Sequence, residues 1–476
     1  MNKPIPLCVD MDGTLLKTDT LLELLFGVLR MQPWVLLLLP LWCLRGKVFL
    51  KRELSARCSL NVALLPANTD FLAFLHAEKA NGRALYLATG AYRDVAQQVA
   101  DHYGFFSGVL ATEDKNLTGN TKALAMVEQF GAKGFDYAGN SAVDRQCWEQ
   151  ARQCYLVNAN PTIAKKMSAL FVFEKIFDLR NHMTIALLLR ALRIHQWAKN
   201  ALVFVPLFAS HHMLVWSYLQ NTLLGFVAFG CCASLSYLIN DISDLEADRQ
   251  HRSKYTRPLA SGELSVQAGF VLALLLACAA VLLSAMLPLG FVYSIAAYFI
   301  VTSFYTLRLK HIPILDVAVL AGLYTSRVVA GGFSAQAETS FWLLAFSCFI
   351  FFSLAIVKRL SELQSMVGST KEEPAQCRGY WTSDILVLTG LGTASAMMAV
   401  LVLALYINSP DVVELYSSPR FLWALCPVMA LWLGRVWLIT GRNEMHDDPV
   451  VFALRDPMSW LLFALAGIFM VVGAMA

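Results

Sequence analysis

Charge is scarce in this 476-residue sequence, and paired cysteines are missing from it. Only 15% of the residues are charged, against roughly 25% in soluble domains, while 57% are hydrophobic. This balance excludes an ordinary soluble protein and favours one embedded in a membrane. The net charge of +4 is too small for this length to indicate nucleic-acid binding. The 11 cysteines include no CxxC pair, so we expect reduced thiols that pack as small hydrophobic residues. The first residues do not have the pattern of a signal peptide.

The sequence changes character near residue 180, which predicts two domains, 1–178 and 179–476. The first part has ordinary polarity and alternates helical stretches with short apolar runs at Leu7–Asp10, Ala84–Ala88 and Phe135–Ala138. Such alternation is typical of an α/β domain with a doubly wound, Rossmann-like sheet.

One segment of the first domain is exceptionally apolar. Residues Leu21 to Leu44 contain Pro33, Pro40 and Arg30, which make the segment a poor membrane-spanning helix. We expect an apolar cap near residues 20–45 that rests on a membrane surface, with a buried core helix as the alternative.

The second domain consists mainly of apolar runs of the length that crosses a bilayer. About nine transmembrane helices are predicted, near 184–209, 219–239, 265–284, 288–306, 314–332, 341–358, 385–407, 419–440 and 457–475. The loops that follow the even-numbered helices are rich in Lys and Arg, which places them in the cytoplasm. The N-terminal domain is then cytoplasmic as well.

A carboxylate pair follows the first predicted strand, in the sequence Asp10-Met11-Asp12-Gly13-Thr14. A carboxylate at the end of a strand can attack phosphorus, and a second one two residues later can act as acid and base. Gly13 allows the sharp turn that this arrangement needs. An ordinary strand-end turn is the simpler alternative.

Three later elements accompany this pair: Thr89-Gly90, Lys122, and Asn140 with Asp144. In this order they resemble the haloacid-dehalogenase (HAD) phosphatase family over about the first 165 residues. The resemblance implies a nucleophile at Asp10, an acid/base at Asp12, phosphate binding by Thr89, Gly90 and Lys122, and a Mg²⁺ held by Asp10, Asn140 and Asp144. The family usually has an aspartate at the position of Asn140, so metal affinity and phosphatase activity are in question.

The membrane domain contains the sequence Asn240-Asp241-Ile242-Ser243-Asp244, which continues to Asp248. Aspartates spaced by three and four residues stack on one face of a helix. Because three carboxylates repel one another unless a cation neutralises them, they suit a Mg²⁺ that bridges a pyrophosphate. A solvated acidic loop beside a membrane helix is the simpler alternative. With the following basic stretch, which includes Lys254 and Arg257-Pro258-Leu259, the motif resembles the NDxxDxxxD…RPLxSG signature of the UbiA superfamily.

A second polar set follows. Its members are Tyr305, Arg308, Lys310, Asp316 and Arg327, and Lys358 is a further candidate at the end of the sixth predicted helix. Charges inside the hydrocarbon region are costly and usually functional. Asp316 and Arg327 are alternatively interpreted as a structural ion pair, and Lys358 as a residue at the cytoplasmic edge.

Two chemistries within this superfamily share the aspartate motif. Arg193, Gln196-Trp197, Lys199 and Asn200 resemble the RPxQWxKN stretch of decaprenyl-phosphate phosphoribosyltransferases. That resemblance implies transfer of phosphoribose from phosphoribosyl pyrophosphate to a polyprenyl phosphate, and the HAD-like domain then removes the 5-phosphate. The product is expected to serve cell-envelope glycan synthesis in a bacterial inner membrane. The alternatives are an aromatic prenyltransferase of quinone or haem-related synthesis and a transporter. Lipid chain length, glycan, organism and oligomeric state do not follow from the sequence.

Overall fold

The computed structural model describes residues 4–177, 184–210, 213–251, 254–367, 376–377, 379–410, 412, 416–445 and 448–475. The chain forms two compact units. The first comprises residues 1–192 and 237–274, and the second comprises residues 193–236 and 275–476. The predicted domain boundary between 178 and 179 lies outside the described residues.

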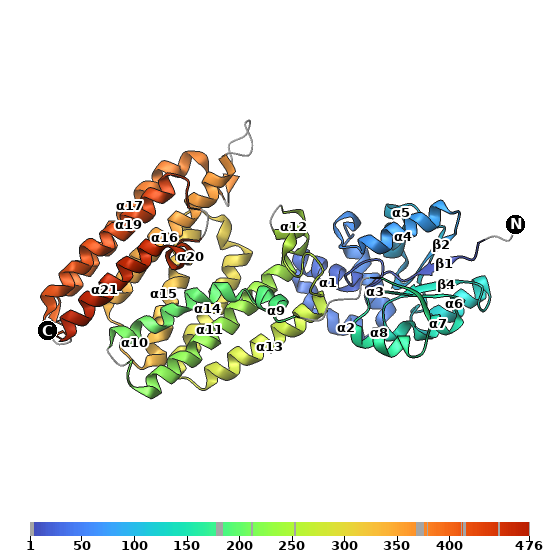
Figure 1. The fold of residues 1–476 in the computed structure, drawn as a ribbon, viewed down its shortest axis with the longest axis horizontal. Coiled ribbons are helices and arrows are strands. Elements are labelled where there is room, and N and C mark those ends of the chain that lie inside the picture. The colour runs from blue at the N-terminus through green and yellow to red at the C-terminus, as the bar shows by residue number, and fades with distance from the viewer. Residues whose placement is uncertain are drawn as a thin grey trace. The chain divides into compact units, whose positions relative to one another are not determined.

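The first unit contains a parallel sheet with the strand order β3-β2-β1-β4-β5-β6 (Figure 1). The strands are β1 (Leu7–Val9), β2 (Leu85–Tyr92), β3 (Gly108–Thr112), β4 (Asp136–Gly139), β5 (Cys154–Val157) and β6 (Phe173–Phe177). This topology confirms the predicted doubly wound α/β fold. The strand order reverses between β1 and β4, and ligands of such sheets bind at the carboxyl ends of the strands beside this point.

Helices cover both faces of the sheet. Helices α4 (Thr69–Ala80) and α5 (Arg93–Tyr103) lie on one side, and α6 (Asn120–Phe130), α7 (Arg145–Gln150) and α8 (Pro161–Ser168) lie on the other (Figure 1). Successive residues of a strand point to opposite faces. Accordingly, Leu7 and Val9 belong to one buried cluster and Cys8 to the other.

The apolar segment after β1 folds into short helices instead of one long one. These are α1 (Thr20–Met31), the 3-10 helix η1 (Pro33–Leu37) and α2 (Leu39–Leu44), and α3 (Lys47–Arg57) follows them. Pro33 stands at the start of η1 and Pro40 at the start of α2, where a missing N–H is tolerated. None of these helices has the length of about 20 residues that a bilayer requires.

Among the described residues, eight helices have the length and composition of membrane spans. Each span corresponds to one labelled helix: α11 (Trp216–Ser243), α13 (Val266–Ala285), α14 (Leu289–Leu307), α15 (Leu315–Ala335), α16 (Phe341–Val367), α17 (Ile385–Ile407), α19 (Leu425–Gly441) and α21 (Pro457–Met475). The remaining segment expected to span, 184–209, is divided among α9 (Ile185–Ala191), η4 (Ile194–Phe204) and α10 (Val205–Ala209). The protein is therefore a multi-pass membrane protein.

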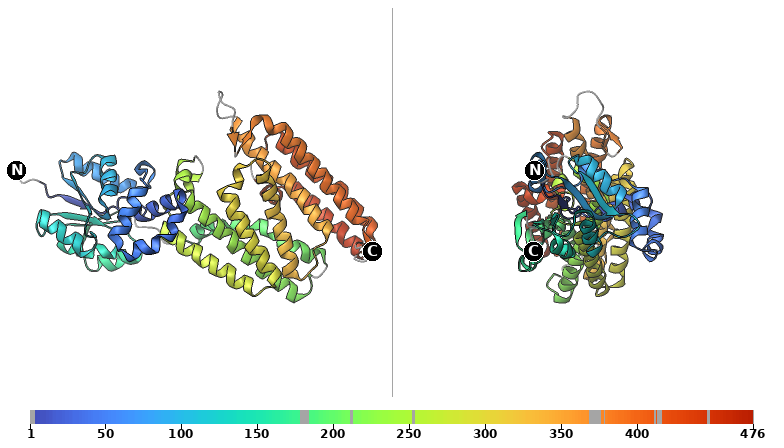
Figure 2. Two further views of the ribbon diagram at one scale, coloured as in Figure 1. Left: turned by 180° about the vertical axis from the view of Figure 1, so that it is seen from behind. Right: turned by 90° about the vertical axis from the view of Figure 1, so that its right-hand side faces the viewer.

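The second unit is held together by packing among its helices. A buried cluster joins α15, α16, α17, α19 and α21, and its members include Val328, Leu354, Ala399, Trp432 and Leu462. Figure 2 shows these long helices from two further directions. Short connecting helices carry many of the polar residues discussed below, among them η6 (Leu309–His311) and α20 (Pro449–Arg455).

Candidate functional sites

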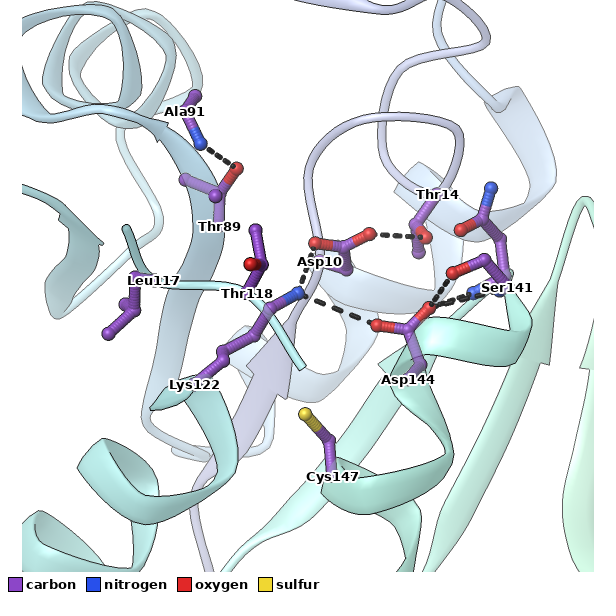
Figure 3. A network of polar contacts seen from close by, with 12 residues as sticks. Asp10, Thr14, Thr89, Ala91, Leu117, Thr118, Lys122, Ser141, Asp144 and Cys147 are labelled. Carbon is purple, nitrogen blue, oxygen red and sulfur yellow. Dashed lines mark hydrogen bonds and ion pairs between the residues drawn. The ribbon is translucent and has the colours of Figure 1, made fainter. Parts of the chain in front are cut away.

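The carboxylate that follows β1 lies in a buried polar network, which Figure 3 shows from close by. Asp10 Oδ1 accepts a hydrogen bond from Lys122 Nζ at 2.8 Å, and Asp10 Oδ2 accepts one from Thr14 Oγ1 at 3.3 Å. Lys122 Nζ also lies 3.5 Å from Asp144 Oδ1. The structure therefore brings Asp10, Lys122 and Asp144 together, although they are widely separated in the sequence.

Tyr137 and Ser141 complete the network around Asp144. The Tyr137 hydroxyl donates to Asp144 Oδ1 at 2.7 Å, and the backbone N–H and hydroxyl of Ser141 both donate to Asp144 Oδ2 at 2.9 Å. Although burial opposes ionisation, Lys122 and these donors hold the pKa of Asp144 below its ordinary value. Asp144 is therefore a fixed, ionised carboxylate.

The two carboxylates of the Asp10–Asp12 pair differ from Asp144. Burial raises the pKa of Asp10 to about 6, against the opposing effect of Lys122. Burial, reinforced by the neighbouring Asp19, raises the pKa of Asp12 to about 7. Asp12 Oδ1 accepts from the backbone N–H of Thr20 at 2.9 Å, at the start of α1. Asp12 thus has the proton affinity of a group that exchanges protons near neutral pH.

A cavity of about 460 Å³ opens beside these side chains, and Asp10, Asp12, Thr89 and Lys122 line it. Thr89 Oγ1 accepts a hydrogen bond from the backbone N–H of Ala91 at 3.0 Å. The cavity is also lined by Gly90, Asn140, Asp144, Lys51 and residues 265–267. All predicted residues of this site therefore share one cavity.

Lys51 is a cavity residue that the sequence did not indicate. It lies on α3, and its Nζ donates to the Gly90 carbonyl at 2.5 Å and to Asn116 Oδ1 at 2.6 Å. Burial lowers its pKa. No sequence motif predicts this lysine, because it reaches the cavity only through the fold of the helices that follow β1.

Gly13 lies directly against Asn140. Its φ is +78°, and a Cβ atom at this position would stand 2.1 Å from Asn140 Nδ2. The turn after β1 therefore favours glycine for its conformation, and a Cβ atom here would displace the Asn140 side chain. The backbone N–H of Asn140 donates to Asp144 Oδ2 at 3.1 Å, so the loop after β4 is tied to the same carboxylate.

The aspartate motif begins on α11 and continues into α12 (Leu245–Gln250). Arg257 Nη1 lies 3.0 Å from Asp241 Oδ1 and 2.5 Å from Asp248 Oδ2. Both carboxylates are buried. Two aspartates seven residues apart therefore converge on one cationic nitrogen.

Asp244 lies at the junction of the two helices and precedes α12. Its N–H bonds to the Asn240 carbonyl at 2.8 Å, and its carbonyl accepts from the Asp248 N–H at 2.8 Å. Lys254 follows in η5 (Lys254–Thr256). Within the described residues, no group of three or more His, Cys, Asp or Glu side chains is arranged to hold a metal ion. The acidic pairs Asp10–Asp144 and Asp241–Asp248 are instead bridged by basic side chains.

The aspartate motif also contacts the cap within the first unit. Arg249 Nη2 lies 2.7 Å from Glu23 Oε1, and both side chains are buried. The Thr18 hydroxyl donates to the same Glu23 oxygen at 2.6 Å. The N-terminal residues of α13 also participate, because Gln267 donates to Asp19 at 2.9 Å.

A cluster of basic residues lies in the second unit. Lys199 Nζ and Lys358 Nζ lie 2.6 and 3.1 Å from Asp448 Oδ2. Burial alone would raise the pKa of Asp448, but the two lysines hold it well below its ordinary value. Lys358 is therefore an ion-pair partner of a buried aspartate and does more than mark the end of a membrane helix.

Asn200 and Arg327 form the adjacent part of the second unit. Arg327 Nε donates to Asn200 Oδ1 at 2.9 Å, and Arg327 Nη2 donates to the Tyr298 hydroxyl at 3.0 Å. Arg193 precedes η4, the 3-10 helix that carries Lys199 and Asn200, with a positive φ of 50°. Within the RIHQWAKN stretch, Lys199 and Asn200 are thus held by Asp448 and Arg327.

Asp316 forms an ion pair with Arg359. The alternative interpretation, an ion pair between Asp316 and Arg327, is therefore wrong. Arg359 Nε lies 2.7 Å from Asp316 Oδ2, with both side chains fully buried. The Tyr380 hydroxyl donates to Asp316 Oδ1 at 2.5 Å, and Arg359 donates to the Tyr305 hydroxyl at 3.2 Å. Lys310 lies in η6, between the helices of Tyr305 and Asp316.

The fold and the sites define a multi-pass membrane protein that carries an α/β domain with a cavity lined by acidic and basic side chains. The UbiA prenyltransferase family model matches residues 201–463. The chain therefore belongs to the UbiA prenyltransferase family.

The chain is also similar to two relatives and to one solved structure. An uncharacterized protein of Sinorhizobium fredii is 35% identical over 98% of this chain and 90% of its own length. The decaprenyl-phosphate phosphoribosyltransferase of Mycobacterium tuberculosis is 30% identical over 61% of this chain and 95% of its own length. A UbiA homolog from Archaeoglobus fulgidus bound to DMAPP and Mg²⁺ is 17% identical, with a TM-score of 0.45, over 60% of this chain and 96% of that one.

Proposed function

We propose that the chain is a bifunctional membrane enzyme that makes a polyprenyl-phosphate pentose for cell-envelope glycans. The membrane part transfers 5-phosphoribose from phosphoribosyl pyrophosphate to a polyprenyl phosphate, and the N-terminal domain then hydrolyses the 5-phosphate. The observation that carries the proposal is the similarity to a decaprenyl-phosphate phosphoribosyltransferase along 95% of that protein's length. We place the enzyme in a bacterial inner membrane with the N-terminal domain in the cytoplasm.

In the transfer step, a phosphate oxygen of the lipid attacks C1 of the ribose. The bond from C1 to the pyrophosphate oxygen breaks, and the electron pair leaves with the pyrophosphate. Negative charge therefore grows on the leaving group, and a cation placed there lowers the barrier. The convergence of Asp241 and Asp248 on a single cationic nitrogen supports a divalent-cation site.

We assign Asp241, Asp244 and Asp248 as ligands of Mg²⁺, with Asn240 beside them. A bound Mg²⁺ would neutralise the departing pyrophosphate. Arg257 would then pass from the two carboxylates to the phosphate oxygens, and Lys254 would assist it. An arginine that is already held at the carboxylates needs only a short movement to follow the charge from protein to substrate.

The remaining phosphates of the two substrates need further cations. Lys199 and Lys358 share one carboxylate, Asp448, so this group of three side chains carries net positive charge. We assign Lys199, Lys358 and Asn200 to phosphate binding, together with Arg193, Lys310 and Tyr305. The Asp316–Arg359 pair is assigned to positioning of the Tyr305 hydroxyl, which Arg359 contacts.

In the hydrolytic step, Asp10 attacks the phosphorus of the 5-phosphate, and Asp12 gives its proton to the departing ribose oxygen. Water, deprotonated by Asp12, then cleaves the phospho-Asp10 bond and releases inorganic phosphate. The raised pKa of Asp12, about 7, suits this alternation. Lys122, Thr89 and Gly90 would hold the phosphate, and Mg²⁺ bound by Asp10, Asn140 and Asp144 would shield its charge.

The test is an Asp10→Asn variant in proteoliposomes with labelled phosphoribosyl pyrophosphate and a polyprenyl phosphate. We expect lipid-linked phosphoribose to accumulate, whereas wild type and the exposed-site control Asp101→Asn release the 5-phosphate. An Asp10→Asn variant that forms the same dephosphorylated lipid as wild type would refute the coupled scheme. Activity with a prenyl diphosphate and an aromatic acceptor, without use of phosphoribosyl pyrophosphate, would establish the aromatic prenyltransferase alternative.

A further inference from the structure

The cap of the N-terminal domain exposes several large apolar side chains on two short helices. In η1 and α2, Leu37 and Leu44 are 79% and 85% exposed, and Trp34 is 57% exposed. Met31, Leu36 and Leu41 are exposed as well. We call these six exposed side chains, of Met31, Trp34, Leu36, Leu37, Leu41 and Leu44, the apolar patch. Soluble surfaces rarely present such a concentration of large apolar side chains unless a membrane or a partner covers it.

The same helices also have a buried side, so the patch is not the result of a cap that failed to fold. Val35 and Trp42 are buried and belong to the same hydrophobic cluster as Leu7 and Val9 of β1. Arg57 stacks on the Trp42 ring at 4.6 Å and fixes the inner face. Apolar side chains therefore occur on both sides of η1 and α2, with one side packed and the other exposed.

Along the sequence, the charged residues between positions 24 and 52 are all basic. From Leu24 to Arg52 the chain contains no carboxylate, but it contains the basic residues Arg30, Arg45, Lys47, Lys51 and Arg52. Of these, Arg30, Arg45 and Lys47 are exposed directly at the ends of the patch. Anionic lipid headgroups attract such residues, while Trp and Leu side chains enter the boundary between headgroups and acyl chains.

We propose that the apolar patch is a membrane-docking surface that lies in the interface of an anionic bilayer. The occupant is lipid, because the same chain crosses a bilayer with its long helices and so keeps this domain close to one. The helices of the cap are too short to span, which leaves insertion parallel to the surface as the way to bury the patch. Docking would hold the cavity of the N-terminal domain at the membrane, where a lipid-linked phosphate is found. The docking itself does not depend on the proposed reactions.

The test measures the depth of single nitroxide labels in the full-length protein, reconstituted at one copy per nanodisc with anionic lipid. A keto-bearing amino acid replaces Leu37 and carries the label, so that the native cysteines stay unmodified. The matched control is a label at Gln129, an exposed position of α6 on the same domain. Relaxation by oxygen, which concentrates in lipid, is compared with relaxation by a water-soluble nickel chelate.

We expect the label at position 37 to be several-fold more accessible to oxygen than to nickel, and the label at position 129 to show the reverse. Replacing the anionic lipid by a zwitterionic one should move the label at 37 toward water. High accessibility of position 37 to nickel, equal to that of position 129, would overturn the proposal by showing a solvated surface. Low accessibility to both reagents would overturn it by showing that protein covers the patch. If the label at position 37 leaves water only with several copies per disc, a second copy is the occupant and the proposal is overturned.

Discussion

Lys122 offers the sharpest test of the N-terminal site, because its ammonium group is the cationic partner of both Asp10 and Asp144. Replacing it by methionine keeps much of the volume but leaves two buried carboxylates without their counter-charge. Removing one partner of a buried ion pair typically costs about 3–5 kcal/mol. At 1.36 kcal/mol per factor of ten, this corresponds to a loss of local stability of about a hundredfold to a few thousandfold.

Hydrogen exchange of the full-length protein, followed by mass spectrometry in the presence of a metal chelator, measures this loss. We expect the peptides of β1 and α6 to lose protection by at least about a hundredfold in Lys122→Met. Lys166→Met, which removes an exposed lysine of α8, is the control and should leave the same peptides unchanged.

The loss should also depend on pH. Burial already raises the pKa of Asp10 to about 6, and the variant lacks the lysine that opposes this rise. Since an acid with a raised folded-state pKa stabilises the fold when protonated and loses that contribution as pH rises, the deficit should be greater at pH 8 than at pH 5.5. A loss of protection below tenfold, or one that does not change with pH, would refute this account of the network.

Two further predictions concern single contacts. Gly13→Ala should abolish phosphatase activity and loosen β4 peptides in exchange, since the new methyl group meets Asn140 at 2.1 Å and φ is +78°; normal activity would contradict the geometry. Glu23→Gln should leave Arg249 buried without its counter-charge and lower protection of α1 and α12 peptides by about a hundredfold or more. The exposed-site control is Glu128→Gln, and equal exchange in both variants would show that the Glu23–Arg249 pair contributes little.

The sequence indicated the fold of the N-terminal domain well where apolar runs are long. The predicted strands at Leu7–Asp10, Ala84–Ala88 and Phe135–Ala138 correspond to β1, β2 and β4. Strands β3, β5 and β6 were not predicted. The residues of β6, Phe173–Phe177, include Glu174 and Lys175 and lie at the edge of the sheet. An edge strand exposes more of its side chains, so its sequence shows less of the apolar pattern.

The candidate sites divide in the same way. Motif residues such as Asp10 and Lys122 were predicted to share a site, because the order of their motifs resembles the HAD phosphatase family. The partners of the basic residues in the membrane part were not predicted. Lys199 and Asp448 are 249 positions apart, and Asp316 pairs with Arg359 across two helices. Such pairs depend on which helix faces pack together, and helix periodicity in one sequence does not determine that.

The most direct test of the central claim uses purified full-length protein with Mg²⁺, radiolabelled phosphoribosyl pyrophosphate and a polyprenyl phosphate. The measured quantity is the label that enters the lipid phase. We predict lipid-bound label that depends on Mg²⁺, is lost in Asp244→Ala, and is retained in Asp101→Asn. An absence of lipid-bound label from the wild-type protein, together with activity on a prenyl diphosphate and an aromatic acid, would contradict the assignment to phosphoribosyl transfer.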